Sequence, residues 1–180
     1  MDLELLLWQT LWLLAPMGIA NMMPVFAAKL ASKYSYPIDG YRSYNGQPLF
    51  GVRKTYRGII AGIIGGAAIF LAQQWLYDSS AWIRQISLFN YPAMTVWYGF
   101  LAGSGALTGD LIKSFFKRRV GIAPGRPWFP FDQVDYLIGG LMLTSWLFWP
   151  GLSQIAALLV LGIVLHIMTN KIGKLLRLRP

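Results

Sequence analysis

Residues 109–135 gather charges of both signs in a chain that is otherwise strongly apolar. The charged side chains of this segment are Asp110, Asp132, Asp135, Lys113, Lys117, Arg118, Arg119 and Arg126. Carboxylates hold divalent metal ions, and Lys and Arg side chains bind phosphate groups. The segment therefore predicts phosphoryl or nucleotidyl transfer at a membrane surface.

The three carboxylates have a structural interpretation as well as a chemical one. A helix is expected to begin near Asp132, where Asp132 and Asp135 would favour the helix dipole and could cap the first turn. Two such acids on one face repel each other unless a cation lies between them, and Asp110 at the membrane edge is costly without a partner. Mg²⁺ prefers oxygen ligands, so the three aspartates are candidate ligands for one or two ions.

A second helix is expected to run through Arg119 and to end near Gly121 and Pro124. Helical spacing puts a carboxylate, two ammonium groups and a hydroxyl on one face, namely Asp110, Lys113, Ser114 and Lys117. The run 117–119, considered alone, is better explained as an anchor to anionic headgroups. A turn at Pro124 and Gly125 is expected to fold the chain back, so that the two halves of the segment act together.

A second group of polar residues lies at 50-FGVRKTYRG-58. Lys54 offers a point charge and Thr55 a hydroxyl for phosphate oxygens, and the flanking glycines allow a close backbone approach. The spacing is not that of a Walker A loop. Considered alone, the stretch is better explained as a basic tether before a membrane helix.

Composition sets the class of protein. Hydrophobic residues make up 56% of the 180 residues and charged residues 13%, which is too apolar for an ordinary soluble domain. We expect an all-α integral membrane protein, with residues 1–180 as one membrane-embedded domain. The absence of cysteine excludes disulfides and thiolate chemistry, and the single histidine, His166, excludes a multi-histidine metal site. The N-terminus lacks the basic region of a cleavable signal peptide.

Five segments are candidate membrane-spanning helices: Leu3–Met23, Ile59–Tyr77, Tyr91–Thr108, Val134–Trp149 and Leu152–Met168. A helix needs about 20 residues to cross about 30 Å of hydrocarbon. The last three segments are short, so their ends must draw on interfacial residues. The small residues of 62-GIIGGAA-68 are best explained by close helix packing.

The distribution of positive charge favours the same count. With five spans, 15 of the 16 Lys and Arg residues fall on one side of the membrane, and only Arg84 falls on the other. The positive-inside rule then predicts a multi-pass protein of the cell membrane whose C-terminus and active-site loops are cytoplasmic and whose N-terminus is outside. Topology also accounts for the high pI without nucleic-acid binding.

Together these motifs resemble the CDP-archaeol synthase branch of the CDP-diglyceride synthetase superfamily. The resemblance covers nearly the whole chain, in family order, through 21-NMMP-24, 54-KTYRG-58, 109-GDLIKSFFKRRVGIAPGRP-127, 132-DQVDYLIGG-140 and 166-HIMTN-170. The wider superfamily carries Gly-His-Gly-Gly and Asp-Arg-x-Asp-Ser signatures. This chain instead has Arg-Pro-Trp at 126–128 and Asp-Gln-Val-Asp at 132–135, which favours the archaeol-type branch.

The resemblance implies five helices and a cytoplasm-facing polar site that transfers CMP from CTP to a glycerol-phosphate lipid (archaetidic-acid-like), releasing pyrophosphate. It implies Mg²⁺ as cofactor, with CTP, the lipid and the bilayer as partners; a homodimer is one option for assembly. The implied catalytic residues are Asp110, Asp132, Asp135 and Lys117, with the three aspartates as metal ligands. The implied substrate-binding residues are Lys54, Thr55, Arg57, Lys113, Ser114, Arg118 and Asn21. His166 and Asn170 are secondary candidates.

Two other functional classes stay open. A non-enzymatic membrane protein whose polybasic loops bind anionic lipid or a partner accounts for the cations, but it leaves the clustered acids unexplained. A CDP-alcohol phosphatidyltransferase-like enzyme also binds metal through Asp residues, but its D-G-x₂-A-R…G-x₃-D-x₃-D pattern is absent. The lipid is open too: an isoprenoid ether, a diacyl ester or another lipid phosphate would meet apolar helix faces that leave no motif.

Overall fold

Helices make up most of the computed structural model, which describes residues 2–31, 33–123 and 126–175. The helices are α1 (Leu3–Leu30), α2 (Tyr56–Leu76), α3 (Ala81–Ile86), α4 (Trp97–Arg119), α5 (Phe131–Thr144) and α6 (Leu152–Leu175), with a 3-10 turn, η1 (Tyr77–Ser79). Two short strands, β1 (Ser43–Tyr44) and β2 (Gln47–Pro48), pair as an antiparallel hairpin. The expected turn at Pro124 and Gly125, and the basic tail residues Arg177 and Arg179, lie outside the described residues.

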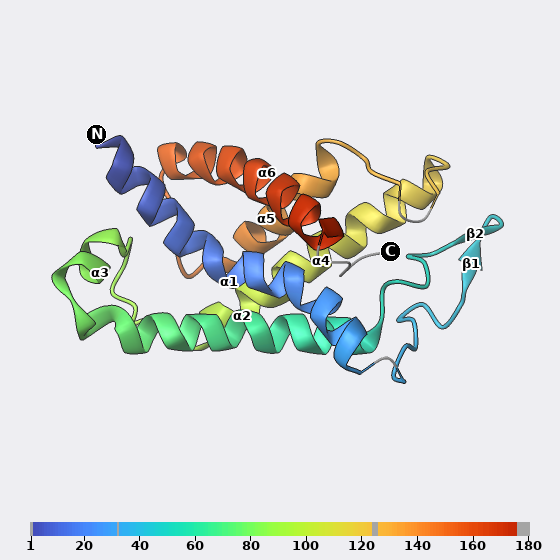
Figure 1. The fold of residues 1–180 in the computed structure, drawn as a ribbon, viewed down its shortest axis with the longest axis horizontal. Helices are drawn as coiled ribbons and strands as arrows, with labels where there is room; N and C mark the ends of the chain where they lie inside the picture. Colours follow the sequence, from blue (N-terminus) through green and yellow to red (C-terminus); the bar gives the residue numbers. More distant parts are fainter. Residues whose placement is uncertain (1, 32, 124–125, 176–180) are drawn as a thin grey trace.

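The long helices α1, α2, α4, α5 and α6 alternate in direction, so their connections gather at two ends of the bundle (Figure 1). The N-terminus, α3 and the α5–α6 connection lie at one end. The β1–β2 hairpin and the α4–α5 connection lie at the other end. The basic loops therefore share one end of the bundle, as the charge pattern predicts, and Arg84 of α3 lies at the opposite end.

Within the described part of the chain, three helices are long and apolar enough to cross a membrane: Leu3–Leu30, Tyr56–Ser79 and Leu152–Gly173. The expected all-helical membrane architecture is confirmed. The count of five spans stays a prediction, because α4 carries a charged C-terminal half and α5 has only 14 residues. A helix of 14 residues is about 21 Å long, shorter than the hydrocarbon layer.

The helix predicted over Tyr91–Thr108 begins later than expected, at Trp97. The Asn90 side-chain oxygen accepts the Ala93 N–H at 3.2 Å, which closes a turn around Pro92. Asparagine side chains of this kind compete with helix by bonding nearby backbone groups. The same helix continues through Arg119, where the sequence predicts that it ends before Gly121.

The helix predicted over Val134–Trp149 begins earlier and ends earlier, as α5. Its last residue is Thr144, and Trp149 precedes Pro150, which disfavours helical backbone for the residue before it. The helices predicted over Leu3–Met23 and Leu152–Met168 continue past their expected ends, to Leu30 and Leu175.

Small residues bring α2 and α4 into close contact, which confirms the packing interpretation of the run 62–68. A Cβ added at Gly66 of α2 would lie 2.9 Å from the Cα of Gly103 on α4. Large side chains fill the core of the bundle around this contact: Leu13, Met17, Phe70, Tyr98, Leu137 and Leu158. Close helix approach through small residues is the usual way in which membrane helices associate.

Glycines also set the contact between α4 and α5. A Cβ added at Gly109 would overlap the carbonyl oxygen of Asp135, and one added at Gly105 would overlap the carbonyl oxygen of Gly139. The two backbones therefore touch without intervening side chains. This contact fixes Asp110, the residue after Gly109, close to the first turns of α5.

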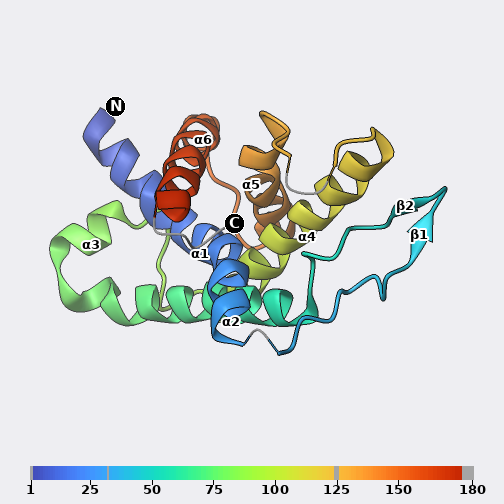
Figure 2. The same ribbon diagram turned by 45° about the vertical axis from the view of Figure 1, so that its right-hand side comes forward.

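The β1–β2 hairpin lies beside the C-terminal end of α4 (Figure 2). Asn45 and Gly46 adopt positive φ angles of 51° and 72° at its turn, the combination that two-residue hairpins favour. Arg119 of α4 donates hydrogen bonds to the carbonyls of Tyr44 at 2.6 Å and Pro48 at 2.8 Å. Arg119 therefore holds the hairpin against α4.

Candidate functional site

Lys113 lies between the three aspartates that the sequence singles out. Its Nζ is 3.1 Å from Asp110 Oδ1, 2.7 Å from Asp132 Oδ1 and 2.9 Å from Asp135 Oδ2. Asp110 lies one turn before Lys113 on α4, whereas Asp132 and Asp135 come from the start of α5. The structure thus brings the three predicted carboxylates together, with an ammonium group at their centre.

Two further lysines contact the cluster from its edges. Lys54, from the connection between α1 and α2, pairs with Asp110 Oδ2. Lys117, one turn after Lys113, contacts both oxygens of Asp132, at 2.9 and 2.7 Å. Three acids therefore meet three lysines, and the formal charges of these six side chains sum to zero.

Asp132 is held by the backbone as well as by lysines. The Trp128 N–H donates to Asp132 Oδ2 at 2.6 Å. Burial by itself raises the pKa of the Asp132 carboxyl, but the bonds from Lys113, Lys117 and Trp128 outweigh burial, so its pKa lies below the ordinary value. Asp132 lies in the first turn of α5, as the structural interpretation has it, but it does not cap the helix, because Pro130 is the N-cap residue and no side chain bonds there as a cap.

The position of Lys113 bears on whether the three aspartates can hold a metal ion. Among residues 2–31, 33–123 and 126–175, no three Asp, Glu, His or Cys side chains are arranged to hold a metal as they lie. The donor chemistry nevertheless fits Mg²⁺, because carboxylate oxygens from three aspartates converge on one cation position. That position is taken by Lys113, so the assignment of Asp110, Asp132 and Asp135 as metal ligands stays a prediction.

Arg118 and Ser114 lie on the same helix as the central lysine and are buried. Arg118 donates to the carbonyl of Ile122, which closes the C-terminal end of α4. Ser114 follows Asp110 by about one helical turn, as the spacing predicts, and Arg118 follows it by slightly more than two. Their predicted contacts with substrate phosphates stay predictions.

Thr55 and Arg57 have protein partners at the start of α2. Thr55 Oγ1 accepts the Gly58 N–H at 3.2 Å and caps the helix. Arg57 donates to the Ala31 carbonyl at 2.5 Å and lines an open cavity with Tyr36. The structure therefore gives both residues a structural role beside their predicted role in substrate binding.

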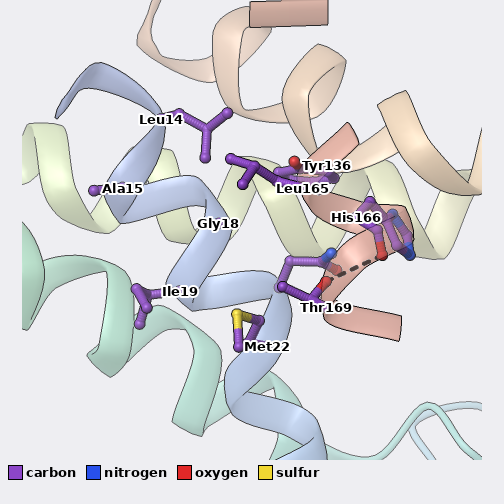
Figure 3. A pocket seen from close by; sticks show the side chains of 10 residues that line it. Leu14, Ala15, Gly18, Ile19, Met22, Tyr136, Leu165, His166 and Thr169 are labelled. Atoms are coloured by element: carbon purple, nitrogen blue, oxygen red, sulfur yellow. Dashed lines mark hydrogen bonds between the residues drawn. The ribbon is translucent and has the colours of Figure 1, made fainter. Parts of the chain in front are cut away.

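An apolar pocket of about 250 Å³ lies between α1, α5 and α6 (Figure 3). Its polar lining comes from Asn21, Tyr136, His166 and Thr169, and the Thr169 hydroxyl donates to the His166 carbonyl at 3.1 Å. Tyr136 connects the pocket to the cluster, because its N–H donates to Asp135 Oδ1 at 2.7 Å. The structure thus places Asn21 in this pocket with His166, and its predicted role in substrate binding stays a prediction.

Residues 3–180 match the family described as CarS-like: CDP-archaeol synthase. The chain belongs to the CDP-archaeol synthase family. The CDP-archaeol synthase of Methanoregula boonei is 38% identical over 144 residues, which cover 76% of this chain and 83% of that protein. The CDP-archaeol synthase of Pyrobaculum aerophilum is 32% identical over 168 residues, 93% of each chain.

A solved structure of an intramembrane enzyme for archaeal membrane lipid biosynthesis shares the fold of this CDP-archaeol synthase family member. The two structures align with a TM-score of 0.69 at 29% sequence identity, over 89% of this chain and 91% of the other. The resemblance carried by the five motifs is therefore confirmed. The match also confirms that this family member is an intramembrane helical protein.

Asp39 shapes the connection between α1 and α2 of this CDP-archaeol synthase relative, and sequence reasoning missed it. Its carboxylate accepts the backbone N–H groups of Tyr41, Phe50 and Gly51, each at 3.1 Å. Burial raises the pKa of the Asp39 carboxyl, but these donors outweigh burial and hold the pKa below its ordinary value. The available signal was the Asp-Gly pair at 39–40, since Asp before Gly marks turns that its side chain closes.

Replacing Asp39 by alanine is expected to destabilise this connection by about 1–3 kcal/mol, because buried N–H donors lose their acceptor. Asp39→Asn keeps one acceptor oxygen and should have an intermediate effect. Faster amide hydrogen exchange at Tyr41, Phe50 and Gly51 would report the loss directly. Exchange at the wild-type rate in Asp39→Ala would contradict the assigned role.

The stabilisation by Asp39 should also depend on pH. Because the pKa of Asp39 is lower in the folded than in the unfolded state, its contribution is fully present above about pH 4 and is lost as the pH falls through the folded-state pKa. Wild type and Asp39→Ala should therefore differ in amide protection at neutral pH and converge in acid. A difference that grows in acid would contradict this linkage.

Proposed function

We propose that this chain is a membrane CTP-dependent cytidylyltransferase. It converts CTP and a glycerol-phosphate lipid, archaetidic-acid-like, into a CDP-lipid and pyrophosphate in phospholipid biosynthesis. Membership of the CDP-archaeol synthase family supports this activity over the two alternative classes. Residues 1–180 act as one domain, and a homodimer stays a prediction.

The observation that carries the proposal is the meeting of three acids and three lysines where α4 leaves the bundle beside α5. A polybasic protein that only bound anionic lipid would need the lysines but not the buried carboxylates. Burying a carboxylate costs free energy, so buried carboxylates are expected where they bind a metal ion or a positively charged group. The second half of α4 and the first turns of α5, which carry the cluster, lie towards the same end of the bundle as the β1–β2 hairpin.

The reaction needs no protein nucleophile. An oxygen of the lipid phosphate attacks the α-phosphorus of CTP, and the bond from that phosphorus to the bridging oxygen breaks as pyrophosphate leaves. The protein contributes by positioning both substrates and by neutralising charge. Lys54, Lys117 and Arg118 would bind the triphosphate, while Ser114 and Thr55 would donate hydrogen bonds to its oxygens.

Asp110, Asp132 and Asp135 would hold Mg²⁺. When bound, the ion supplies Lewis-acid polarisation and offsets negative charge on the phosphates. Backbone N–H groups orient two of these carboxylates: the Trp128 N–H donates to Asp132, and the Tyr136 N–H donates to Asp135. Second contacts of this kind keep metal ligands in place.

The pocket between α1, α5 and α6 would receive part of an apolar lipid chain. Most of its wall is apolar, and Tyr136, one of its polar lining residues, follows Asp135 in the chain. The chain crosses the cell membrane several times, with the N-terminus outside and the C-terminus and active-site loops in the cytoplasm, where CTP is bound. The asymmetry in positive charge between the two ends of the bundle supports this orientation.

The decisive test is CMP transfer by the purified protein in liposomes. With CTP labelled at its α-phosphate, we expect the label to enter the lipid fraction when archaetidic acid or phosphatidic acid is present. Addition of EDTA should abolish incorporation, and added Mg²⁺ should restore it. Failure with every lipid phosphate tested would favour the non-enzymatic alternative.

Ligand-induced stabilisation gives an independent readout. CTP with Mg²⁺ should raise the thermal midpoint of the protein in detergent, because a ligand that binds only the native state stabilises it. GTP at the same concentration is the matched control. Equal stabilisation by the two nucleotides would argue for unspecific binding of polyphosphate to the basic end.

A further inference from the structure

We propose that Lys113 is an internal counter-cation that occupies the acid cluster in the metal-free protein and must leave before a divalent ion can bind. Lys113 thereby sets the metal affinity of the site. This inference rests on the proposed function, because it concerns the ion that the cytidylyltransferase would use. It gives Lys113 a role in the metal-free protein, in addition to the phosphate contact that the resemblance implies.

The first argument is a match between donors and acceptors. A lysine ammonium carries three N–H donors and no acceptor. Lys113 has one carboxylate oxygen within 3.1 Å from each of three different aspartates. Each N–H of Lys113 can therefore donate to one aspartate. While these three contacts persist, no N–H of Lys113 is left for a substrate phosphate.

The second argument is the electrostatic need of the acids. Asp110, Asp132 and Asp135 have side chains that are 17%, 15% and 5% exposed. Three ionised carboxylates around one point would repel strongly at low exposure, and burying such charges unpaired is costly. A cation at their centre removes the repulsion, so the metal-free cluster depends on Lys113.

The third argument is the contrast with the neighbouring lysines. Lys54 contacts Asp110, and Lys117 contacts Asp132, whereas Lys113 contacts all three acids. A metal ion held by the three carboxylates must therefore take the place of the Lys113 ammonium and of neither other lysine. Two cations cannot share one centre, so metal binding and these Lys113 contacts exclude each other.

Release of Lys113 has a consequence for the nucleotide. The ammonium lies on a flexible four-carbon stem, so once displaced it can turn from the acids towards a bound triphosphate. A triphosphate that gives Lys113 a new partner makes its departure less costly. Metal and nucleotide should therefore each raise the affinity for the other, and by the same factor.

The test measures the binding of Mn²⁺ to the full-length protein in detergent by electron paramagnetic resonance. In Lys113→Met, which keeps the stem and removes the charge, we expect Mn²⁺ to bind at least about tenfold more tightly than in wild type without nucleotide. The gain in Mn²⁺ affinity on adding CTP should shrink in the same variant. The metal-free variant should unfold at a lower temperature than wild type, and Mg²⁺ should reverse the loss.

Two matched variants separate this role from general charge effects. Lys117→Met removes a lysine that touches one acid and should change Mn²⁺ affinity less than Lys113→Met. Lys29→Met removes an exposed cation in the last turn of α1 and should change it least. Equal gains in all three variants would overturn the proposal, as would wild-type Mn²⁺ affinity in Lys113→Met.

If Lys113→Met fails to fold even with Mg²⁺, Lys113→Gln decides, because its amide still donates to carboxylates but carries no charge. Unchanged Mn²⁺ affinity in Lys113→Gln would overturn the proposal. Failure of the proposed function has a different signature, because wild type itself would then neither transfer CMP nor bind Mn²⁺ with CTP. A wild type that does both, beside a Lys113 variant with unaltered metal affinity, rejects only the role of Lys113.

Discussion

The Asp135→Asn variant is expected to lose CMP transfer by at least about 100-fold. Asparagine keeps the shape of the side chain but removes the charge that Asp135 contributes to the proposed metal site. The lost charge stabilisation is worth several kcal/mol, and each 1.4 kcal/mol corresponds to about tenfold in rate. The assay is incorporation of α-labelled CMP into lipid at saturating CTP and Mg²⁺.

Asp78→Asn is the control for this substitution. Asp78 lies at the opposite end of the bundle, its side chain is 79% exposed, and its contact with Arg84 is 4.0 Å long. It should transfer CMP at the wild-type rate, since exposed pairs of this kind contribute little. Wild-type turnover in a folded Asp135→Asn protein would remove the aspartate cluster from the catalytic machinery.

Gly109→Ala is expected to damage both the fold and the activity. The added Cβ would overlap the Asp135 carbonyl oxygen and lie 3.2 Å from the Gly139 Cα. These atoms belong to the backbone of α5, so no side-chain rotation relieves the contact, and the two helices must separate. We expect a loss of about 1–3 kcal/mol or more in stability and a fall in CMP transfer, because Asp110 moves away from Asp135.

Gly173→Ala is the matched control, because it makes the same chemical change in another helix. A Cβ added at Gly173 of α6 meets no atom within 4 Å. Alanine is the better helix former by about 1 kcal/mol, so this variant should be as stable as wild type or more so. Thermal unfolding in detergent compares the two variants. Equal stability of Gly109→Ala and wild type would show that the α4–α5 contact can relax.

The positions of helices could be predicted where local signals are strong. The sequence of α4 from Asp110 to Arg119 has the expected helical face, because its charged and aromatic residues follow helical periodicity. The boundaries near Asn90 and Thr144 were predicted incorrectly. The Asn90 side chain bonds the backbone before α4, and Pro150 disfavours helical backbone at Trp149; hydropathy alone registers neither effect.

The composition of the site could be predicted, but its arrangement could not. The spacing of Asp110 and Lys113 predicts their mutual contact, because residues three apart on a helix are neighbours. The contacts of Lys113 with Asp132 and Asp135 depend on how closely α4 approaches α5, which the glycines set. No pattern within one helix contains that distance, so the position of Lys113 between the three aspartates could not be predicted.

The separate partners of the KRR run, residues 117–119, could not be predicted from the sequence either. Considered alone, the three cations are better explained as one anchor to anionic headgroups, whereas the family resemblance implies roles for Lys117 and Arg118 at the site. In the structure Lys117 meets Asp132, Arg118 bonds the Ile122 carbonyl, and Arg119 holds the hairpin. Adjacent residues on a helix point about 100° apart, so a run of like charges divides among different partners.

Helix α4 carries the glycine contact with α5 and the charged residues of the site on one uninterrupted rod. The direction in which the site residues point is therefore fixed relative to the glycines. Inserting a single residue after Gly109 would rotate the following residues of α4 by about 100° about the helix axis and shift them by about 1.5 Å along it. Asp110 and Lys117 would then face lipid or solvent while the glycines still fit α5. Substitutions along this helix can be local, but any change in its length between Gly109 and Lys117 uncouples the site from the bundle that positions it.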